Sequence, residues 1–558
     1  IGVFVCACGR NIGGVIDVNE VASYASRLPS VVVSEVVGHG CSRESLARID
    51  SIIKDQGLNR IVIGGCSPRT HLGLFQDLAR RAGLNKYLVD MANIRDQDTW
   101  VHGKEPDKAT EKAKDLIRMS VVSSALLHPL TEHTLPVNKD ALVVGGGVTG
   151  MNAAMSLADQ GVKVYLVDRA PELGGVATHV RKTLEGEDVQ AYLADLAEKV
   201  RNHPRIQVMT RSVIVDHSGM PGMFKTGLQV GPRMNYREIN HGVAILATGA
   251  LPNRPQEYLL GSHGAVMTQL DMESVLEDEP ERVKSWNQVV MIQCVDSRIP
   301  ENPSCSRICC QAAVKNALRI LEIHPEAQVC VLYRDMRTYG FQEEYYTKAR
   351  EKSVMFSRYT PDRKPRVSEK DSRVEVEFYD PVLAKEFRIP ADCLVLSTGF
   401  VADEEGTEDL ATIFHLNRND AGYFLEDHVK LRPVDLSVPG FLVAGTSHSP
   451  KGIRECIAQA QAAAGRALTY LARETITLGA SVARVDRDKC AACLICVRAC
   501  PFGVPFINAE GYSEIDPSLC HGCGVCAAEC PAKAIQLMEF EDAQLTARVD
   551  GLLERIVS

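Results

Sequence analysis

The sequence of 558 residues lacks the features that mark several common classes of protein. No apolar run reaches the 18 or more residues that a membrane-spanning helix needs, so we expect no transmembrane segment. The formal net charge of −9 provides no basic excess for binding nucleic acid. Residues 1–5 are too short for a signal peptide and carry no basic leader. These absences favour a cytoplasmic protein that spans no membrane and binds no nucleic acid.

The chain is too long for a single hydrophobic core, and its patterns divide it into five segments. Residues 1–135 alternate short apolar runs with helical patterns, as a small α/β domain does. Residues 136–260 and 393–480 read as two parts of one Rossmann-type domain, with an α/β domain inserted at residues 261–392. Residues 481–558 read as a cysteine-rich α+β module followed by an amphipathic helix. The only internal repeat that we detect lies in this module, where the cysteine pattern recurs after 30 residues.

Nineteen cysteines are too many for a reduced enzyme of this size without metal, and eight of them form two regular runs. The runs are Cys490-x2-Cys493-x2-Cys496-x3-Cys500-Pro501 and Cys520-x2-Cys523-x2-Cys526-x3-Cys530-Pro531. This is the spacing of a ferredoxin with two [4Fe–4S] clusters, in which each run gives its fourth cysteine to the other cluster. We therefore expect one cluster on Cys490, Cys493, Cys496 and Cys530, and the other on Cys520, Cys523, Cys526 and Cys500. The alternatives are two structural zinc sites or a secreted disulfide protein, and the two complete runs argue against both.

A glycine-rich loop lies between the apolar run 141–144 and a helical pattern, and it reads Gly145-x-Gly147-x-x-Gly150. In dinucleotide-binding domains the first glycine permits a tight turn and the second lets the backbone approach a pyrophosphate. The third lets the helix pack on the strand. The N-terminus of that helix offers free N–H groups and positive potential to the phosphates. Asp168, 23 residues after Gly145, is placed to accept hydrogen bonds from a ribose hydroxyl.

Such a loop alone is a weak signal, but three further segments favour FAD over NAD at this site. Gly174-Gly175 follows Asp168, a pairing that resembles flavoproteins with two dinucleotide-binding domains. Residues 244–249 end in Thr248-Gly249 and read as the strand and turn that return the chain to the dinucleotide. Residues 441–445 end in Gly445 and resemble the late FAD-binding strand of those proteins. An unused glycine turn in an empty α/β domain is the alternative.

A second glycine-rich loop, which would bind NAD(P)H in the inserted domain, is missing. The strand expected at residues 289–293 is followed instead by Cys294-Val-Asp-Ser-Arg298. Four thiols lie here within 17 residues: Cys294, Cys305, Cys309 and Cys310. They could hold a further [4Fe–4S] cluster or be buried structural cysteines, and their spacing leaves both open. Binding of a pyridine nucleotide at the usual place is not expected.

Short segments spread over nearly the whole chain share one resemblance. They are Cys6-Ala-Cys8-Gly9, Gly65-Cys66-Ser67-Pro68-Arg69, Met91-Ala-Asn-Ile-Arg95, the Gly145 loop, Ile292-Gln-Cys294, residues 302–310 and the double ferredoxin run. With these segments the chain resembles the HdrA-like family, the iron–sulfur flavoproteins of heterodisulfide reductase. The resemblance implies FAD in a thioredoxin-reductase-like domain, together with a cluster near it on Cys294, Cys305, Cys309 and Cys310.

The resemblance also implies roles for two lysines and for the N-terminal cysteines. Lys315 is expected near flavin N5, where its charge would stabilise the reduced ring, and Glu273 is the acidic residue that would pair with it. Lys451 is expected along the pyrimidine side of the flavin. A further cluster in the N-terminal domain would use Cys6, Cys8, Cys41 and Cys66. Asp98 stands where this family commonly has a cysteine, so it could be an oxygen ligand, or the site could be empty.

Other residues are expected to have no chemical role. Cys330, Cys393 and Cys456 follow no pattern and read as buried thiols. His71 and His448 read as packing or surface residues rather than catalytic bases. Many members of the family carry a second two-cluster ferredoxin inserted in the flavin domain. Here residues 215–240 contain only a short hairpin-like stretch.

The resulting prediction is an FAD- and iron–sulfur-containing electron-transfer subunit of an anaerobic oxidoreductase complex. It would split flavin electron pairs into single steps, and electron bifurcation is a further possibility that the missing ferredoxin makes less secure. The resemblance implies HdrB- and HdrC-like partners, a hydrogenase- or formate-linked donor, soluble ferredoxin and a dimeric assembly. The alternatives are an NAD(P)H-dependent flavoenzyme like the small subunit of glutamate synthase, and a cluster-bearing scaffold without turnover.

Overall fold

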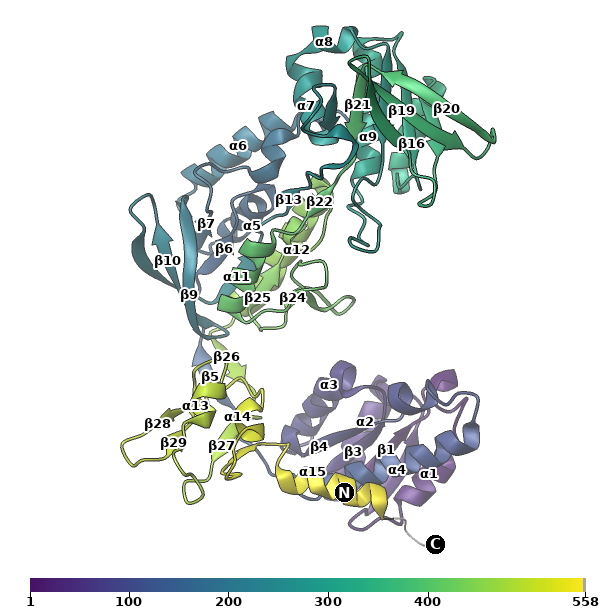
Figure 1. Ribbon diagram of the computed structural model, residues 1–558. Helices are drawn as coiled ribbons and strands as arrows, with labels where there is room; N and C mark the ends of the chain where they lie inside the picture. Colours follow the sequence, from purple (N-terminus) through teal and green to yellow (C-terminus); the bar gives the residue numbers. More distant parts are fainter. Residues whose placement is uncertain (555–558) are drawn as a thin grey trace. The chain divides into compact units, whose positions relative to one another are not determined.

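The computed structural model describes residues 1–554, which fall into two compact units (Figure 1). One unit joins Ile1–Thr134 to the C-terminal part from Thr477 onward, and the other unit is Leu135–Ile476. None of the helices among the described residues is long and apolar enough to cross a membrane. The five-segment division stays a prediction, and its parts are taken below within their own units.

The N-terminal domain is built on a parallel sheet with the strand order β2-β1-β3-β4. The strands are β1 (Gly2–Cys6), β2 (Val33–Val37), β3 (Ile61–Gly65) and β4 (Val89–Asn93). The helices are α1 (Val18–Ala25), α2 (Arg43–Asp55), α3 (Pro68–Arg81) and α4 (Pro106–Ser124). Strands β1 and β3 are buried along their whole length, as expected for a parallel sheet covered on both faces. The α/β character predicted for this segment is confirmed.

The C-terminal module of the same unit consists of short strands and single-turn helices. Its strand pairs are β27 (Ala483–Val485) with β30 (Ile535–Leu537), and β28 (Phe506–Ile507) with β29 (Ser513–Glu514). Its two short helices are α13 (Ile495–Ala499) and α14 (Val525–Ala528). The predicted C-terminal helix is α15 (Asp542–Leu553), where Arg548 donates to the Asp90 carboxylate at 2.6 Å and to Ser123 Oγ of α4 at 3.1 Å. The end of that prediction, residues 555–558, lies outside the described residues.

The second unit begins with a seven-stranded sheet of order β23-β24-β25-β12-β6-β7-β8. Its strands are β6 (Ala141–Val144), β7 (Val164–Val167), β8 (Ile206–Met209), β12 (Val243–Leu246), β23 (Glu426–His428), β24 (Arg432–Leu436) and β25 (Phe441–Val443). The main helices beside it are α5 (Val148–Ala158), α6 (Val189–Asn202) and α12 (Ile453–Leu471). Strands β25, β12, β6, β7 and β8 pair in parallel, so their carboxyl ends lie at one edge. Ligands of open α/β sheets bind at that edge.

The inserted domain has a fully parallel sheet of order β14-β21-β15-β16-β17. Its strands are β14 (Val266–Thr268), β15 (Gln288–Ile292), β16 (Gln328–Tyr333), β17 (Met355–Arg358) and β21 (Cys393–Leu396). The predicted boundary at residue 393 is therefore too early, because β21 pairs with β14 and β15 of the inserted domain. The chain returns through a two-stranded ribbon of β13 (Leu251–Pro252) and β22 (Phe400–Val401).

The two domains of this unit share a plan that the sequence did not reveal. Each carries a three-stranded antiparallel meander before the strand that re-enters its main sheet. The first meander is β9 (Ser212–Met220), β10 (Met223–Val230) and β11 (Asn235–His241), and the second is β18 (Arg366–Lys370), β19 (Arg373–Asp380) and β20 (Lys385–Ala391). The first replaces the short hairpin expected at residues 215–240. The ferredoxin repeat is thus not the only internal repeat, since this one recurs in backbone plan without a shared residue pattern.

Candidate functional site

The glycine-rich loop connects β6 to α5, and its three glycines meet different steric demands. A Cβ on Gly145, at φ 110°, would lie 2.2 Å from the Ala247 carbonyl oxygen, and one on Gly150 would lie 1.7 Å from the Gly145 carbonyl oxygen. Only glycine fits at either position. A Cβ on Gly147 would find no atom nearer than 3.9 Å. The open space beside Gly147, at the N-terminus of α5, suits the close approach of a phosphate.

Asp168 ends strand β7 and is already engaged by its own loops. Its Oδ1 accepts a hydrogen bond from the backbone N–H of Ala170 at 2.7 Å, and its Oδ2 accepts one from the backbone N–H of Gly146. A carboxylate can accept further bonds, so the predicted contact with a ribose hydroxyl is compatible with this arrangement. Gly174 follows at φ 125° and donates to the Gly146 carbonyl oxygen at 2.9 Å, which brings Gly174-Gly175 against the phosphate loop.

The opposite wall comes from the ends of β12 and β25. Thr248 follows β12, and its buried Oγ1 has no hydrogen-bond partner within residues 1–554. Gly249 turns the chain at φ 86°. Gly445 follows β25 at φ 77°, and a Cβ there would lie 2.3 Å from Thr149 Oγ1. An unpartnered buried hydroxyl beside two tight glycine turns fits a polar ligand held at the edge of the sheet.

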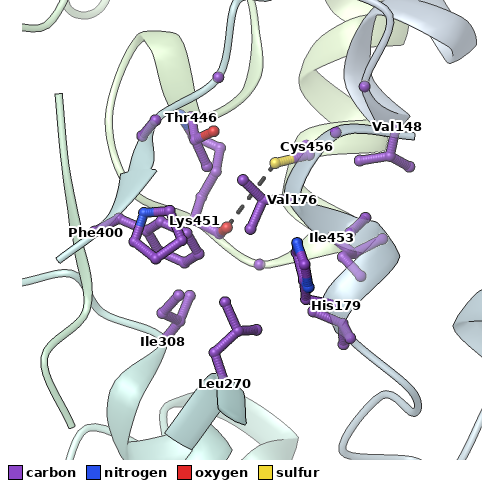
Figure 2. A pocket seen from close by; sticks show the side chains of 18 of the residues that line it. Val148, Val176, His179, Leu270, Ile308, Phe400, Thr446, Lys451, Ile453 and Cys456 are labelled. Atoms are coloured by element: carbon purple, nitrogen blue, oxygen red, sulfur yellow. Dashed lines mark hydrogen bonds between the residues drawn. The ribbon is translucent and has the colours of Figure 1, made fainter. Parts of the chain in front are cut away.

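Lys451 is buried just before helix α12 (Figure 2). Its ammonium donates to the carbonyl oxygens of Gly445 at 2.5 Å and Ser449 at 2.8 Å. Burial lowers the pKa of Lys451 to about 8, against which the nearby Cys456 and Glu455 act in the opposite direction. Cys456, predicted to be a buried thiol without a role, is buried as expected but also lines the cavity, with Sγ 3.9 Å from the Lys451 carbonyl oxygen.

These groups surround one cavity of about 560 Å³, a size typical of cofactor sites. The glycine loop, Asp168, Gly174-Gly175, Thr248-Gly249 and Lys451 line it from the first domain. Ile308, Cys309 and Lys315 line it from the inserted domain. Figure 2 shows Ile308 and Leu270 facing Lys451 and His179 across this space. The glycine cradle, the helix N-terminus and the orphan hydroxyl together fit FAD.

The four cysteines of the inserted domain are brought together from two segments. Cys294 follows β15, and Cys309 and Cys310 begin helix α9 (Cys309–Ile323). Burial raises the pKa of all three thiols, that of Cys310 to about 11, and Cys294 and Cys305 act on both Cys309 and Cys310 in the same direction. Closely spaced buried thiols become thiolates only with a compensating cation, which suits a metal cluster.

The backbone around these thiols shares a signature with the ferredoxin runs. Cys294, Asp296 and Arg298 have φ values of 58°, 51° and 57°, whereas the residues between them do not have positive φ. The same alternation occurs at Ala492 and Leu494, and at Gly522 and Gly524. Alternating left- and right-handed residues turn backbone N–H groups toward one concave side, which is how phosphate and Fe–S sites are often lined. This loop stands where a pyridine-nucleotide loop would lie.

Lys315 lies on α9 and forms an ion pair with Glu273 on α7 (Gln269–Asp278). The ammonium also donates to the Lys182 carbonyl oxygen at 2.8 Å, and Glu273 Oε2 accepts from the Arg181 backbone N–H at 3.1 Å. Burial lowers the pKa of Lys315, although Glu273 opposes the shift. The pairing implied by the family resemblance is thus present, and both side chains line the cavity.

The C-terminal cysteines converge in the two predicted sets. A small cavity is lined by Cys490, Cys493, Cys496 and Cys530 together, although Cys530 is distant from the others in sequence. Around Cys526, whose pKa burial raises to about 11, the neighbouring thiols are Cys520, Cys500, Cys523 and Cys496. Backbone N–H groups of Ser513 and Ala483 donate to the sulfurs of Cys490 at 3.3 Å and Cys520 at 3.5 Å. Such bonds favour thiolate ligands of Fe–S clusters.

The N-terminal cysteines are less uniformly placed. Cys66 is near Cys6 and Cys41, and Cys6 is near Cys8. Cys6 Sγ accepts from the Gly40 N–H at 3.2 Å, and Cys66 Sγ lies 3.0 Å from His71 Nδ1. His71 thus contacts a predicted cluster ligand instead of serving only in packing. The ligand set of Cys8, Cys41 and Cys66 stays a prediction.

Asp98 is fully buried in the N-terminal domain, and neither carboxylate oxygen has a hydrogen-bond partner within the described residues. Burial raises its pKa to about 6, and Lys112 opposes the shift. An unpaired buried carboxylate is costly, which fits either a cation or a proton on this group. In the flavin domain, by contrast, His448 is paired with Glu426 at 2.9 Å and Gln459 at 3.0 Å, as a packing residue would be.

Comparison with known families supports the cofactors. A model of FAD dependent oxidoreductases matches residues 140–229, and models of 4Fe-4S binding domains match residues 482–505 and 513–536. The expected FAD site and the two C-terminal [4Fe–4S] clusters are thereby confirmed. The zinc and disulfide alternatives for the C-terminal runs fall with them.

Curated relatives match over nearly the full chain. The chain is 34% identical to the HdrA component of the H(2):CoB-CoM heterodisulfide,ferredoxin reductase of Methanothermobacter thermautotrophicus, covering 99% of this chain and 97% of the relative. It is 31% identical to the HdrA component of the CoB--CoM heterodisulfide reductase of Methanocaldococcus jannaschii, covering 99% and 98%. Among solved structures, thioredoxin reductase of Lactococcus lactis is similar at a TM-score of 0.42 and 17% identity, covering 60% of this chain and 99% of that one.

Proposed function

The chain belongs to the HdrA family of heterodisulfide reductase proteins, and on that premise we propose that it is the FAD- and iron–sulfur-containing electron-transfer subunit of a heterodisulfide reductase complex. The observation that carries the proposal is the shared cavity, which the dinucleotide loop and the cysteine run line together. When bound, FAD exchanges electron pairs or single electrons, whereas each cluster carries one electron at a time.

The residues of the first domain bind and orient the dinucleotide. The α5 N-terminus and Gly147 receive the pyrophosphate, Asp168 the ribose, and Thr248 Oγ1 supplies a hydroxyl that is otherwise unpaired within the described residues. Lys451 contributes a cation held by two backbone carbonyl groups. These contacts fix which end of the cavity the reactive ring occupies.

The inserted domain supplies the electron-transfer side of the cavity. Cys294, Cys305, Cys309 and Cys310 are proposed to hold a third cluster, and Cys309 itself borders the cavity. Lys315 is proposed to hold a positive charge next to the ring, which favours a reduced and more negative ring. Glu273 and the Lys182 carbonyl oxygen position that ammonium and stabilise its proton in spite of burial.

The C-terminal module is proposed to pass electrons to partner proteins. Cys493 and Cys523 are exposed, one in each ligand set, so both clusters would lie close to the protein surface. The partners we propose are HdrB- and HdrC-like proteins, a hydrogenase- or formate-linked donor, and soluble ferredoxin. Relatives differ here: one is named as an H(2)-linked reductase, and another, from Methanosarcina acetivorans, as Ferredoxin/F(420)H(2)-dependent.

The relatives also carry more residues than this chain. The alignment with the Methanothermobacter thermautotrophicus protein spans 644 positions against 558 residues here. This agrees with the expected absence of an inserted ferredoxin, so one acceptor branch would come from another protein. Our proposal therefore rests on electron transfer and does not require bifurcation.

The test is iron and flavin content, together with redox-titrated EPR, of anaerobically purified protein. One FAD with about 12 to 16 irons, at four per cluster, would support three or four clusters. About 8 irons with FAD would confine the clusters to the C-terminal module and remove the Cys294–Cys310 site from the proposal. A preparation that binds clusters but no FAD would refute it.

A further inference from the structure

Arg298 holds its guanidinium between a predicted cluster ligand and a carboxylate. Nη1 lies 3.9 Å from the Sγ of Cys294, and Nη2 donates to Asp335 Oδ2 at 2.6 Å. The Arg298 side chain is only 17% exposed, whereas Asp335 is 44% exposed. The positive group therefore lies on the protein side of this ion pair, toward the thiols.

The position of Arg298 is fixed from several directions. Its carbonyl oxygen accepts a hydrogen bond from Arg334 Nη1 at 2.7 Å. Arg358 contacts the other carboxylate oxygen of Asp335 at 3.4 Å and is 60% exposed. The carbonyl oxygen of Asp335 accepts a long hydrogen bond from Cys310 Sγ at 3.6 Å. Asp335 is thus linked to two of the four cysteines, to Cys294 through Arg298 and to Cys310 through its own backbone.

The charged groups facing these thiols are mostly cationic. Arg298 and Arg334 both favour the thiolate of Cys294 against the burial that opposes it, and Arg337 does the same for Cys310. Cys305 Sγ accepts from a backbone group, the N–H of Arg307 at 3.3 Å. Within residues 1–554, Arg298 is the one charged side chain that donates to the sulfur of any of these four cysteines.

A fixed cation beside a thiolate-bound cluster acts on its redox equilibrium. A [4Fe–4S] cube with four thiolates is negatively charged, and the added electron increases that charge, so a nearby cation stabilises the reduced form more. Arginine stays charged at every accessible pH and donates from a rigid fork. We propose that Arg298 is a positioning residue that raises the reduction potential of the cluster held by Cys294, Cys305, Cys309 and Cys310, with Asp335 limiting its effect. This inference rests on the proposed function.

The test uses the full-length, cluster-loaded protein and EPR-monitored redox titration. Arg298→Met should shift the midpoint of this one cluster to lower potential, and Arg298→Lys should recover part of the shift. Asp335→Asn should shift it upward, because the guanidinium loses its counter-charge. Arg358→Gln is the matched control: it also removes a cation beside Asp335, but one that does not reach a thiol, and it should change the potential least. The two C-terminal clusters serve as internal standards in every titration.

Opposite shifts for Arg298→Met and Asp335→Asn, with unchanged C-terminal midpoints, would establish the role. An unchanged midpoint in Arg298→Met would overturn it. If Arg298→Met fails to retain the cluster by iron analysis, Asp335→Asn decides, and a downward or absent shift there overturns the inference. A wild-type protein with only about 8 irons would instead refute the cluster site itself. That outcome is distinct, because it appears before any variant is compared.

Discussion

Replacement of Gly147 by alanine separates cofactor binding from folding. The residue has φ −73°, which alanine adopts without strain, and the added Cβ would meet no atom closer than 3.9 Å. Gly147 nevertheless lines the cavity at the start of α5. The methyl group would therefore occupy space that a phosphate needs, while leaving the empty protein as stable as before.

The size of the loss follows from the contacts at the helix N-terminus. A phosphate there accepts bonds from free N–H groups, and a hydrogen bond to a charged group contributes about 1.5 kcal/mol or more. Loss of two such bonds would cost about 3 kcal/mol, which weakens FAD binding roughly 100-fold. The assay is FAD titration of flavin-stripped protein by fluorescence, with thermal unfolding of the same stripped sample.

Two other glycines provide the comparison. Gly161→Ala lies outside the cavity at φ 87° with no atom within 4 Å, so it should lower stability by about 1 kcal/mol and leave FAD binding unchanged. Gly150→Ala would collide with the Gly145 carbonyl oxygen at 1.7 Å and should destabilise the domain itself. Wild-type affinity in Gly147→Ala would refute the placement of the pyrophosphate.

Three further predictions follow from the ion pairs and thiols. Glu273→Gln should destabilise the protein by about 3–5 kcal/mol at neutral pH, because Lys315 stays buried without its carboxylate; since burial lowers that lysine's pKa, the penalty should shrink as urea unfolding is repeated at higher pH, and a pH-independent penalty would contradict this. Lys451, with a pKa of about 8, binds its proton more weakly folded than unfolded, so flavin-stripped protein should gain stability as pH rises from about 8 toward about 10.4, and thermal unfolding of Lys451→Met should lack that gain. Cys530→Ala should remove about four irons and one EPR signal, and Cys500→Ala the other signal; loss of the same signal in both would disprove the crossed ligand sets.

The sequence was most informative where chemistry requires fixed spacing. Eight cysteines in two runs predicted two clusters, since each cube takes three thiolates from one short loop and the fourth from the other run. The glycine loop predicted a dinucleotide for a similar reason, because its backbone can meet a phosphate only without side chains. Both signals are local, so they can be read from neighbouring residues.

Other parts of the site carried no local signal. Cys456 follows no pattern, yet it lines the cavity because α12 begins beside Lys451. The placement of Arg298 against Cys294 and Asp335 depends on two strands of the inserted sheet, β15 and β16, whose ends the parallel pairing brings together. The matching plan of the two domains was also invisible, since a meander is specified by backbone pairing and many sequences satisfy it.

The sequence by itself therefore determined the class of cofactors and the family, because those depend on residue types at fixed intervals. Tertiary structure decided that the glycine loop and the cysteine run border the same cavity, although Gly147 and Cys309 are 162 residues apart. It also decided that Lys315 is paired with Glu273 and buried, where the helix pattern alone allowed an exposed lysine. The physical reason is that charge pairing and burial depend on which elements pack together, and packing over such separations leaves no mark on local spacing.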